Sequence, residues 1–350
     1  MKEIRVGNKA SKYPIIQGGM GVGVSLHNLA GNVSKEGGIG VISTADIGYK
    51  EEDFNSNPLK ANLRAIGTEI KMAREIAGED KILGVNVMVA LSDYEAIVKE
   101  CVKNNIDLII SGAGIPKELP EYVQGSNTKI APIVSSRRCC ELIVKHWIKK
   151  YNYVPDMIVI EGPEAGGHLG FKKEELVEGK KPNLHDITRE VIEYVKEVED
   201  EYSKEIPVIV AGGIWNKEDI NRFLSLGASG VQMATRFVAT YECDADDAFK
   251  IAYVNAKKED IKIVTSPVGM PGRAICNDFI LKTEREKCKI NKCYNCIKTC
   301  HVTDAPYCIT KALINSVNGD TQNGLIFCGS NVDRVKEIVS VHDLMKELVD

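Results

Sequence analysis

Eight short apolar runs, separated by charged segments of helical character, constrain the fold of this chain more than any other feature. The runs cover residues 14–17, 39–43, 82–89, 108–111, 130–134, 157–161, 208–211 and 230–233. Strands that are buried on both faces of a parallel sheet read as continuous Val, Ile and Leu runs of this kind. Eight such strands with helices between them predict an α/β fold, the (β/α)8 TIM barrel. A doubly wound open sheet is the alternative, because a count of strands does not prove closure.

The segments between and after the runs predict further elements. Apolar residues recur at steps of three and four within residues 185–204, which is typical of an amphipathic outer helix. Residues 171–183 are rich in Lys and Glu and predict a loop, either a flap over a site or a solvated connection. Residues 265–273 alternate Pro and Gly with other residues and predict a structured loop, and residues 333–348 predict a final helix.

We divide the chain into a barrel, residues 1–285, and a cysteine-rich C-terminal extension, residues 286–350, packed on it. The 350 residues carry 45 Lys and Arg against 49 Asp and Glu, a net charge of −4, which argues against nucleic acid or a membrane as partner. The N-terminus lacks the apolar core of a signal peptide. Eleven cysteines in such a chain fit a cytoplasmic protein with free thiols or metal ligands. We expect a small-molecule substrate, and a homodimer is an open alternative.

Glycines follow several of the predicted strands, at the end of a barrel where ligands bind. The first strand ends in Gln17, Gly18, Gly19 and Met20. The sixth strand leads into the sequence EGPEAGGHLG at residues 161–170. Glycine has no Cβ, so the backbone can approach a ligand closely. This second motif then places one titratable imidazole beside that ligand.

The ends of the seventh and eighth strands predict a phosphate site. Gly212 and Gly213 follow the seventh strand, and the eighth ends in the sequence QMAT at residues 232–235. The loops after these two strands supply backbone N–H donors to phosphate in many barrels. A phosphorylated substrate and FMN both fit such a site. Gln17 and Asn86 favour FMN, because their amides suit the pyrimidine edge of a flavin, although a buried amide that ties strands together is the alternative for Asn86.

These motifs resemble the nitronate monooxygenase family, formerly the 2-nitropropane dioxygenases, and the related flavin-dependent enoyl-acyl-carrier-protein reductases. The resemblance covers residues 10–280 and rests on PIIQGGM at 14–20, GVN at 84–86, EGPEAGGHLG at 161–170, AGGI at 211–214 and GASGVQMATRF at 227–237. It implies a barrel with noncovalent FMN, and His168 as the catalytic histidine. The residues it implies for cofactor binding are Gln17, Gly18, Gly19, Met20, Asn86, Ala165, Gly166 and Gly167 at the isoalloxazine, with Gly212, Gly213, Gln232, Met233, Ala234 and Thr235 at the phosphate.

Three activities follow from the resemblance. The first is FMN-dependent oxidation of nitronates or similar small anions with oxygen. The alternative is NAD(P)H-dependent reduction of an enoyl thioester, and the third is a non-catalytic flavin or iron–sulfur redox sensor, against which His168 argues. Oxygen-using members of the best-known class carry a lysine in the fifth strand, whereas residues 131–136 have none, which favours the reductase. A barrel of the IMP dehydrogenase type needs a cysteine loop after the sixth strand, and that loop has no cysteine here.

A second departure from the family is the cysteine segment, residues 288–308. Cys293, Cys296, Cys300 and Cys308 have the spacing of metal ligands and resemble the iron–sulfur motif of the old-yellow-enzyme group. The spacing predicts a [4Fe–4S] cluster ahead of zinc. A helix that packs three of these thiols on one face is the alternative. Arg273, in the loop after the eighth strand, is predicted to meet a carboxylate or phosphate of a substrate or nucleotide, with a surface ion pair as the alternative.

Overall fold

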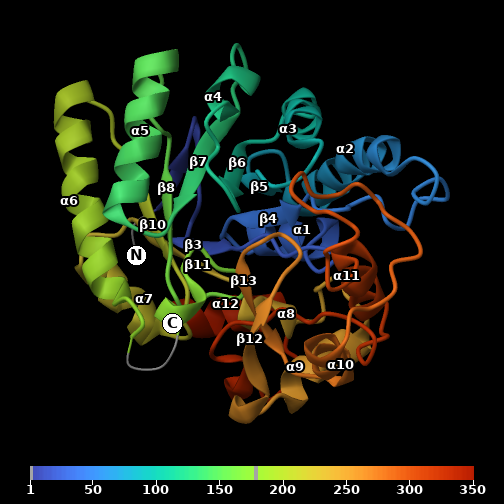
Figure 1. Ribbon diagram of the computed structural model, residues 1–350. Helices are drawn as coiled ribbons and strands as arrows, with labels where there is room; N and C mark the ends of the chain where they lie inside the picture. Colours follow the sequence, from blue (N-terminus) through green and yellow to red (C-terminus); the bar gives the residue numbers. More distant parts are fainter. Residues whose placement is uncertain (1–2, 177–179) are drawn as a thin grey trace.

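The computed structural model describes residues 3–176 and 180–350, and its centre is a closed parallel barrel (Figure 1). The barrel strands are β3 (Ile15–Gln17), β4 (Gly40–Ser43), β5 (Leu83–Met88), β6 (Leu108–Gly112), β7 (Lys129–Val134), β8 (Ile158–Glu161), β10 (Val208–Ala211) and β11 (Gly230–Met233). They pair in the order β3-β11-β10-β8-β7-β6-β5-β4. β3 and the chain entering β4 meet through a parallel bridge between Ile16 and Ile39, where the Gln17 N–H donates to the Ile39 carbonyl at 2.9 Å. The predicted (β/α)8 barrel is therefore confirmed, and the open sheet is excluded.

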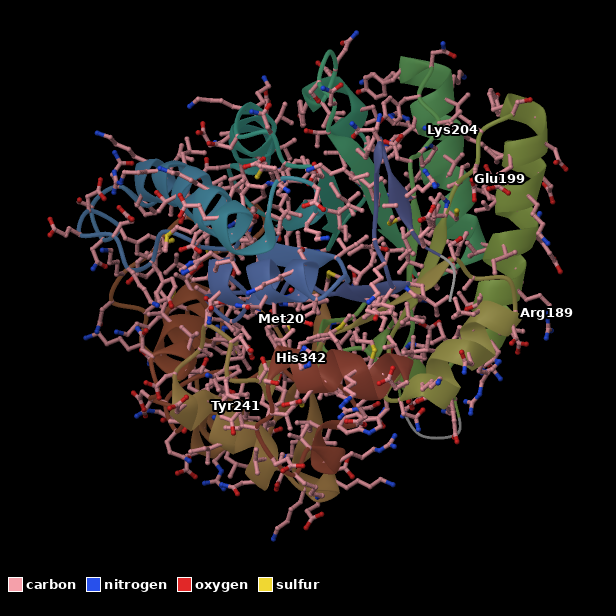
Figure 2. All side chains as sticks on the ribbon, turned by 180° about the vertical axis from the view of Figure 1, so that it is seen from behind. Met20, Arg189, Glu199, Lys204, Tyr241 and His342 are labelled. Atoms are coloured by element: carbon pink, nitrogen blue, oxygen red, sulfur yellow. The ribbon has the colours of Figure 1, made fainter. Side chains whose placement is uncertain are left out.

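Helices surround this barrel and bury their apolar faces against it. They are α1 (His27–Lys35), α2 (Pro58–Ala77), α3 (Tyr94–Lys103), α4 (Leu119–Tyr122), α5 (Arg137–Tyr151), α6 (Leu184–Tyr202), α7 (Lys217–Ser225) and α8 (Thr235–Val238). The predicted outer helix is α6, which buries Val191, Val195 and Val198. Charged side chains on and next to α6, such as Arg189 and Glu199, lie on the outside of the barrel (Figure 2). The antiparallel pair β1 (Arg5–Val6) and β2 (Lys9–Ala10) lies at the opposite end from the strand carboxyl ends.

The rest of the chain gathers on one side of the barrel (orange to red in Figure 1). Its elements are α9 (Asp247–Asn255), β12 (Ile261–Thr265), β13 (Pro271–Ile275), α10 (Asp278–Arg285), α11 (Ile309–Val317) and α12 (Val341–Val349), with short 3-10 turns at Lys173–Leu176, Lys258–Asp260 and Val332–Arg334. β12, β13 and the short β9 (Gly167–His168) form an antiparallel sheet. The segment predicted as a structured loop, 265–273, is thus mostly the turn and inner flank of the β12–β13 hairpin.

The structure also tests the predicted final helix and the predicted loop at residues 171–183. The prediction of a final helix from residue 333 is wrong, because α12 begins at Val341, where the Ser340 hydroxyl caps it by accepting the Asp343 N–H at 3.0 Å. Before it, Val339 forms a parallel bridge with Thr240 in extended chain. The predicted loop 171–183 contains a 3-10 turn, and its residues 177–179 lie outside the described residues. Among the described residues, no helix has both the length and the apolar character needed to cross a bilayer.

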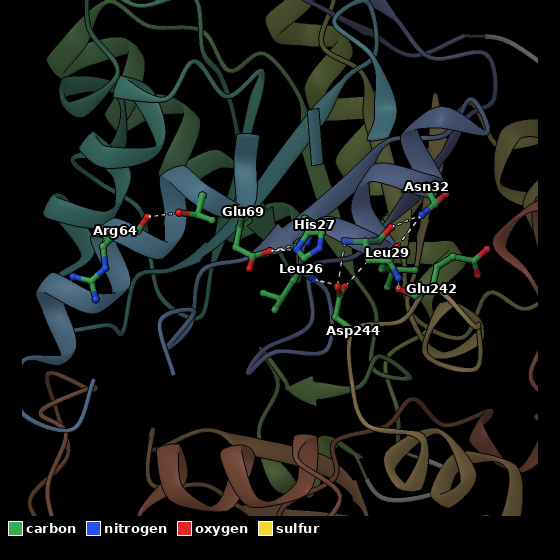
Figure 3. Close-up of polar contacts among 10 residues, drawn as sticks. Leu26, His27, Leu29, Asn32, Arg64, Glu69, Glu242 and Asp244 are labelled. Atoms are coloured by element: carbon green, nitrogen blue, oxygen red, sulfur yellow. Dashed lines mark hydrogen bonds and ion pairs between the residues drawn. The ribbon is translucent and has the colours of Figure 1, made fainter. Parts of the chain in front are cut away.

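The loop that follows β3 is fixed at its far end by a carboxylate from the C-terminal half of the chain (Figure 3). Asp244 accepts the N–H groups of Leu26 at 2.7 Å, of Leu29 at 3.1 Å and of Asn28 at 3.2 Å. Beside it, His27 Nδ1 lies 2.7 Å from Glu69 Oε2 of α2, and this contact raises the pKa of His27. These groups satisfy N–H donors of the first turn of α1, which have no partner within the helix. Residues 18–26 are thereby held between the barrel and the C-terminal region.

Candidate active site

A cavity of about 420 Å³ lies at the carboxyl ends of the barrel strands. Its lining includes Gly18, directly after β3, and the last residue of each other barrel strand, namely Ser43, Met88, Gly112, Val134, Glu161, Ala211 and Met233. This is the end of a (β/α)8 barrel at which active sites are found. The volume is within the range of cofactor and ligand pockets.

Most of the residues that the sequence assigned to a cofactor come together in this cavity. They are Gly18, Gly19, Met20, Asn86, Ala165, Gly166, Gly167, Gly212, Gly213, Gln232, Met233, Ala234 and Thr235, together with His168. Gln17 is the exception, since its side chain is fully buried beneath the cavity. Its Oε1 accepts the Val41 N–H at 3.1 Å, and its Nε2 donates to the Val41 carbonyl at 3.2 Å. Its amide therefore joins β3 to β4 and does not reach a ligand.

Close backbone approach explains several of the glycines. A Cβ on Gly19 would lie 2.5 Å from the Asn86 Cβ, and one on Gly166 would lie 2.6 Å from the Cys328 carbonyl carbon. Gly212 and Gly213 have φ angles of +102° and +82°, which residues other than glycine rarely adopt. The walls of the cavity are thus made by bare backbone at the strand ends, as a large planar ligand requires.

The Gln232 side chain gives a direct test of whether a flavin fits. Its Oε1 is buried and has no hydrogen-bond partner within the described part of the chain. A buried unpaired amide oxygen is costly, so this atom calls for an N–H donor. The imide N–H of a flavin ring is such a donor. The residues present therefore fit a flavin.

His168 lies on β9, opposite Gly272 of β13, and its ring forms part of the cavity wall. Its Nε2 is 2.7 Å from the Ser266 hydroxyl, and the Phe327 ring packs edge-on with centroids 4.9 Å apart. Burial lowers the pKa of His168 to about 4. The imidazole is consequently neutral at pH 7, with one nitrogen to donate a hydrogen bond and one to accept.

Arg273 does not take the place that the sequence suggested. The side chain is buried beneath the loop that leads to His168, and it is not among the residues lining the cavity. Its guanidinium donates to the Pro163 carbonyl at 2.8 Å and to the Ala165 carbonyl. Burial lowers the pKa of this group from its ordinary value. Arg273 thus holds the glycine-rich loop through two carbonyls, and its side chain is buried outside the cavity lining.

Sequence reasoning missed two parts of the site. Glu161, the last residue of β8, lines the cavity, and a carboxyl at the end of an apolar strand was the available signal. The second part is the wall formed by Phe327, Cys328, Gly329, Ser330 and Asn331. Asn331 Nδ2 donates to the Gly213 carbonyl at 2.9 Å, which joins this wall to the end of β10. No local pattern marked this segment, because it reaches the mouth of the barrel only through the tertiary fold.

The charges around the cavity have one sign. Of the described residues that line it, none is Lys or Arg, and Glu161 and Glu164 are the carboxylic acids. Glu164 is paired at the rim with Lys181, at 3.4 Å. β7 does begin with a lysine, Lys129, but this residue lies by Gly7 at the opposite end of the barrel. A ligand in the cavity therefore meets neutral or acidic side chains, and no cation, among the described residues that line it.

The cysteine segment lies against the loop after β5 without regular structure, since no helix or strand covers residues 286–308. Leu91 and Ile297 form an isolated antiparallel bridge there. The helical alternative for the cysteines is therefore excluded. Nor do the side chains, where they lie, form a metal site: in residues 3–176 and 180–350 no three His, Cys, Asp or Glu groups are close enough to hold an ion. No catalytic step is assigned to a metal.

Comparison with known proteins places the chain in a family. The model of the nitronate monooxygenase family matches residues 3–350. The chain belongs to the nitronate monooxygenase family. Membership makes it a flavin-dependent oxidoreductase, as the glycine-lined cavity and His168 suggest.

Individual relatives carry different names. The chain is 30% identical over 305 residues to a probable nitronate monooxygenase of Staphylococcus aureus (strain N315), with 77% of each chain covered. It is 24% identical over 273 residues to the (3aS,4S,5R,7aS)-5-hydroxy-7a-methyl-1-oxo-octahydro-1H-indene-4-carboxyl-CoA dehydrogenase of Rhodococcus jostii (strain RHA1), covering 78% of this chain and 65% of that enzyme.

Solved structures agree on the fold. FabK from Thermotoga maritima superposes with a TM-score of 0.72 at 23% identity, covering 97% of this chain and 92% of FabK. Nitroalkane oxidase from Streptomyces ansochromogenes gives a TM-score of 0.72 at 20% identity, covering 97% and 95%. At these identities the likeness establishes the barrel architecture and leaves the substrate to be argued from the site.

Proposed function

We propose that this protein uses FMN and NAD(P)H to reduce an uncharged activated alkene, such as an enoyl thioester. The observation that carries the proposal is the absence of a free cation in the cavity lining within the described residues, where His168 is neutral. The FMN phosphate would be met by backbone N–H groups after β10 and β11, whereas a nitronate beside His168 would lose hydration without gaining an opposite charge from a described side chain, which is unfavourable. Met88, Ile115 and Ile133 give the lining an apolar part that suits an acyl chain.

The chain's own residues bind and orient. Glycine backbone after β3, β8 and β10 would receive the FMN, and the buried Gln232 oxygen would accept a hydrogen bond from it. When bound, the flavin supplies the hydride that it has taken from NAD(P)H. Ser266 fixes the His168 ring, and the free N–H of the neutral imidazole can donate to the thioester carbonyl oxygen, where negative charge develops.

Nitronate oxidation is the second candidate. It is favoured by the family match and by the name of the Staphylococcus aureus relative, and the same flavin cavity would serve it. The two candidates differ in the electron donor, because NAD(P)H reduces the flavin in the first and the nitronate does so in the second.

Anaerobic reduction of the purified yellow protein separates them. We expect NADH or NADPH to bleach the flavin and an added enoyl thioester to restore its colour. Bleaching by a nitronate and by neither nicotinamide would overturn the proposal in favour of the second candidate. His168→Ala should keep the flavin and slow reoxidation by the thioester about 100-fold, since one donor to a developing oxyanion has that order of effect. His342→Ala, an exposed histidine of α12, is the control.

We also propose, from spacing, that Cys293, Cys296, Cys300 and Cys308 bind a [4Fe–4S] cluster or, failing that, zinc. In support, the Asn295 N–H donates to Cys293 Sγ at 3.3 Å, and Cys308 is the N-cap residue of α11, where the helix N-terminus opposes the burial that raises the pKa of this thiol. The thiols must move together to bind a metal. Iron, sulfide and zinc analysis of anaerobically purified protein tests this, with Cys296→Ser expected to lose the metal and Cys276→Ser to keep it. Absence of both metals from the unmodified protein would remove the proposal.

A further inference from the structure

Glu161 is a carboxyl that faces the reaction chamber and that the steps above leave unused. It ends β8, is in register with Ala211 of the neighbouring strand β10, and lines the same cavity as His168. Its Oε2 accepts the Gly170 N–H at 3.3 Å. Its Oε1 takes part in no hydrogen bond with the residues that the structure describes.

The surroundings of Glu161 favour the protonated acid. Burial raises the pKa of Glu161 to about 7, against the opposing effects of the Gly170 N–H and the charge of Arg273. Arg273 forms no ion pair with it, because its guanidinium is engaged by two backbone carbonyls. The other titratable groups among the described residues of the cavity wall are the neutral His168, Glu164, which Lys181 holds at the rim, and Cys139, Cys328 and Tyr253, whose pKa values burial raises, so that they stay neutral. Among these described groups none is a cation that pairs with the carboxyl, and the charge of Arg273 only partly opposes the effect of burial.

We infer that Glu161 is a second catalytic residue, the general acid that protonates the substrate carbon next to the carbonyl; this inference rests on the proposed alkene reduction. Hydride arrives at the β-carbon, and the electron pair of the C=C bond moves to the α-carbon and the thioester oxygen. The O–H bond of Glu161 then breaks as a C–H bond forms at the α-carbon. Glu161 is left as a carboxylate and recovers a proton from water, while NAD(P)H, oxidised to NAD(P)⁺, has supplied the two electrons.

Glu161→Gln tests this role, because glutamine keeps the oxygen that accepts the Gly170 N–H but cannot give up a proton. The matched control is Glu199→Gln on the outer face of α6 (Figure 2), where one oxygen likewise accepts a single backbone N–H, that of Ile206 at 2.6 Å. Flavin content and reduction by NAD(P)H are expected to stay unchanged in both variants. Reoxidation by an enoyl thioester should fall about 100-fold or more in Glu161→Gln and remain unchanged in Glu199→Gln.

Three further measurements separate a proton donor from a structural glutamate. The unmodified protein should lose reoxidation rate as the pH rises past about 7, whereas Glu161→Gln should be flat. In D₂O the unmodified protein should place deuterium on one face of the α-carbon, and the variant on both. Infrared spectra without substrate should show a protonated carboxyl band that titrates near pH 7 and is missing in Glu161→Gln.

The outcomes are distinguishable. A Glu161→Gln protein that reoxidises within twofold of the unmodified rate, with the same pH profile and the same labelled face, overturns the inference and leaves the proposed function standing. An unmodified protein whose reduced flavin is not reoxidised by the thioester overturns the proposed function, and this role of Glu161 with it.

Discussion

The mouth of the barrel and the cysteine segment lie next to each other but are built differently. At the mouth, regular strands end in glycines that pack tightly, and distant parts of the chain interlock through Gly166 and Asn331. The cysteine segment has no helix or strand and is held to the loop after β5 by contacts such as the Ser92 N–H to the Cys296 carbonyl, at 3.0 Å. The mouth is therefore preorganised by the fold. The cysteine segment is held only by contacts with a neighbouring loop, and a bound metal could still change its arrangement.

Gly166→Val should have the largest effect on flavin binding and stability, because it adds a side chain where the mouth of the barrel is tightly packed. The added side chain has no room next to the Cys328 backbone, since a Cβ at this position would lie 2.6 Å from the Cys328 carbonyl carbon. We expect loss of bound flavin and about 3 kcal/mol or more of stability, since overpacking forces backbone shifts. Flavin absorbance after gel filtration and denaturant unfolding measure the two effects.

A glycine outside the mouth provides the control for this prediction. Gly125 has a φ of +78°, nothing lies within 4 Å of its would-be Cβ, and it does not line the cavity. Gly125→Ala should therefore cost only the strain of the left-handed conformation, about 1 kcal/mol, and keep the flavin. Equal flavin loss in the two variants would show that general loss of stability, and not close packing at the mouth, releases the flavin.

The sequence predicted the parts of this mouth that depend on local pattern. Continuous apolar runs identified all of the barrel strands, because a strand buried on both faces has few other compositions open to it. It did not predict the direction of Gln17, because β3 is too short for alternation to reveal which side chains face the ligand. It misplaced Arg273, because the β12–β13 hairpin carries that side chain beneath residues 163–165. The wall at Phe327 to Asn331 depends on long-range packing that no motif records.

Glu161→Gln should have the next largest effect on stability, and this effect depends on pH. The pKa of Glu161 is about 7 in the folded protein against an ordinary 4.5. A raised carboxyl pKa contributes stability that is present below pH 4.5 and is lost as the pH rises through 7. Glutamine has no such loss. The free energy of unfolding of the variant, relative to that of the unmodified protein, should therefore rise by about 2–3 kcal/mol between pH 4.5 and 8.

Urea unfolding of both proteins at several pH values measures this difference. His168 has the opposite sign, because its lowered pKa removes stability only as the pH falls below 6.5, and it is present in both proteins. Its contribution therefore cancels in the comparison. A difference between the two proteins that does not change with pH would mean that Glu161 titrates in the folded protein as it does in the unfolded chain and is ionised at pH 7, and it would weaken its assignment as an acid.

Asp244→Ala should lower the free energy of unfolding by about 2 kcal/mol, because this carboxylate holds the loop that leads from β3 to α1. Asp244 accepts the N–H groups of Leu26, Asn28 and Leu29, and its loss leaves them without a partner in a partly buried site (Figure 3). Asp246→Ala is the control, because this residue caps the exposed start of α9 through the Ala248 N–H and should cost about 1 kcal/mol or less. Equal costs in thermal unfolding would show that the loop after β3 gains nothing special from Asp244.

Tyr294→Ala should have the smallest effect on stability, because it removes a contact of the cysteine segment and none at the mouth of the barrel. The Tyr294 ring stacks on Phe54 with centroids 5.4 Å apart, and this contact fastens the cysteine segment to the loop after β4. Its loss should cost about 1 kcal/mol, the usual range for an aromatic pair. Tyr241→Ala, at a ring that is 68% exposed, should cost less (Figure 2). Flavin content should be unchanged in both variants. Flavin loss in Tyr294→Ala alone would mean that the cysteine segment contributes to the cofactor site.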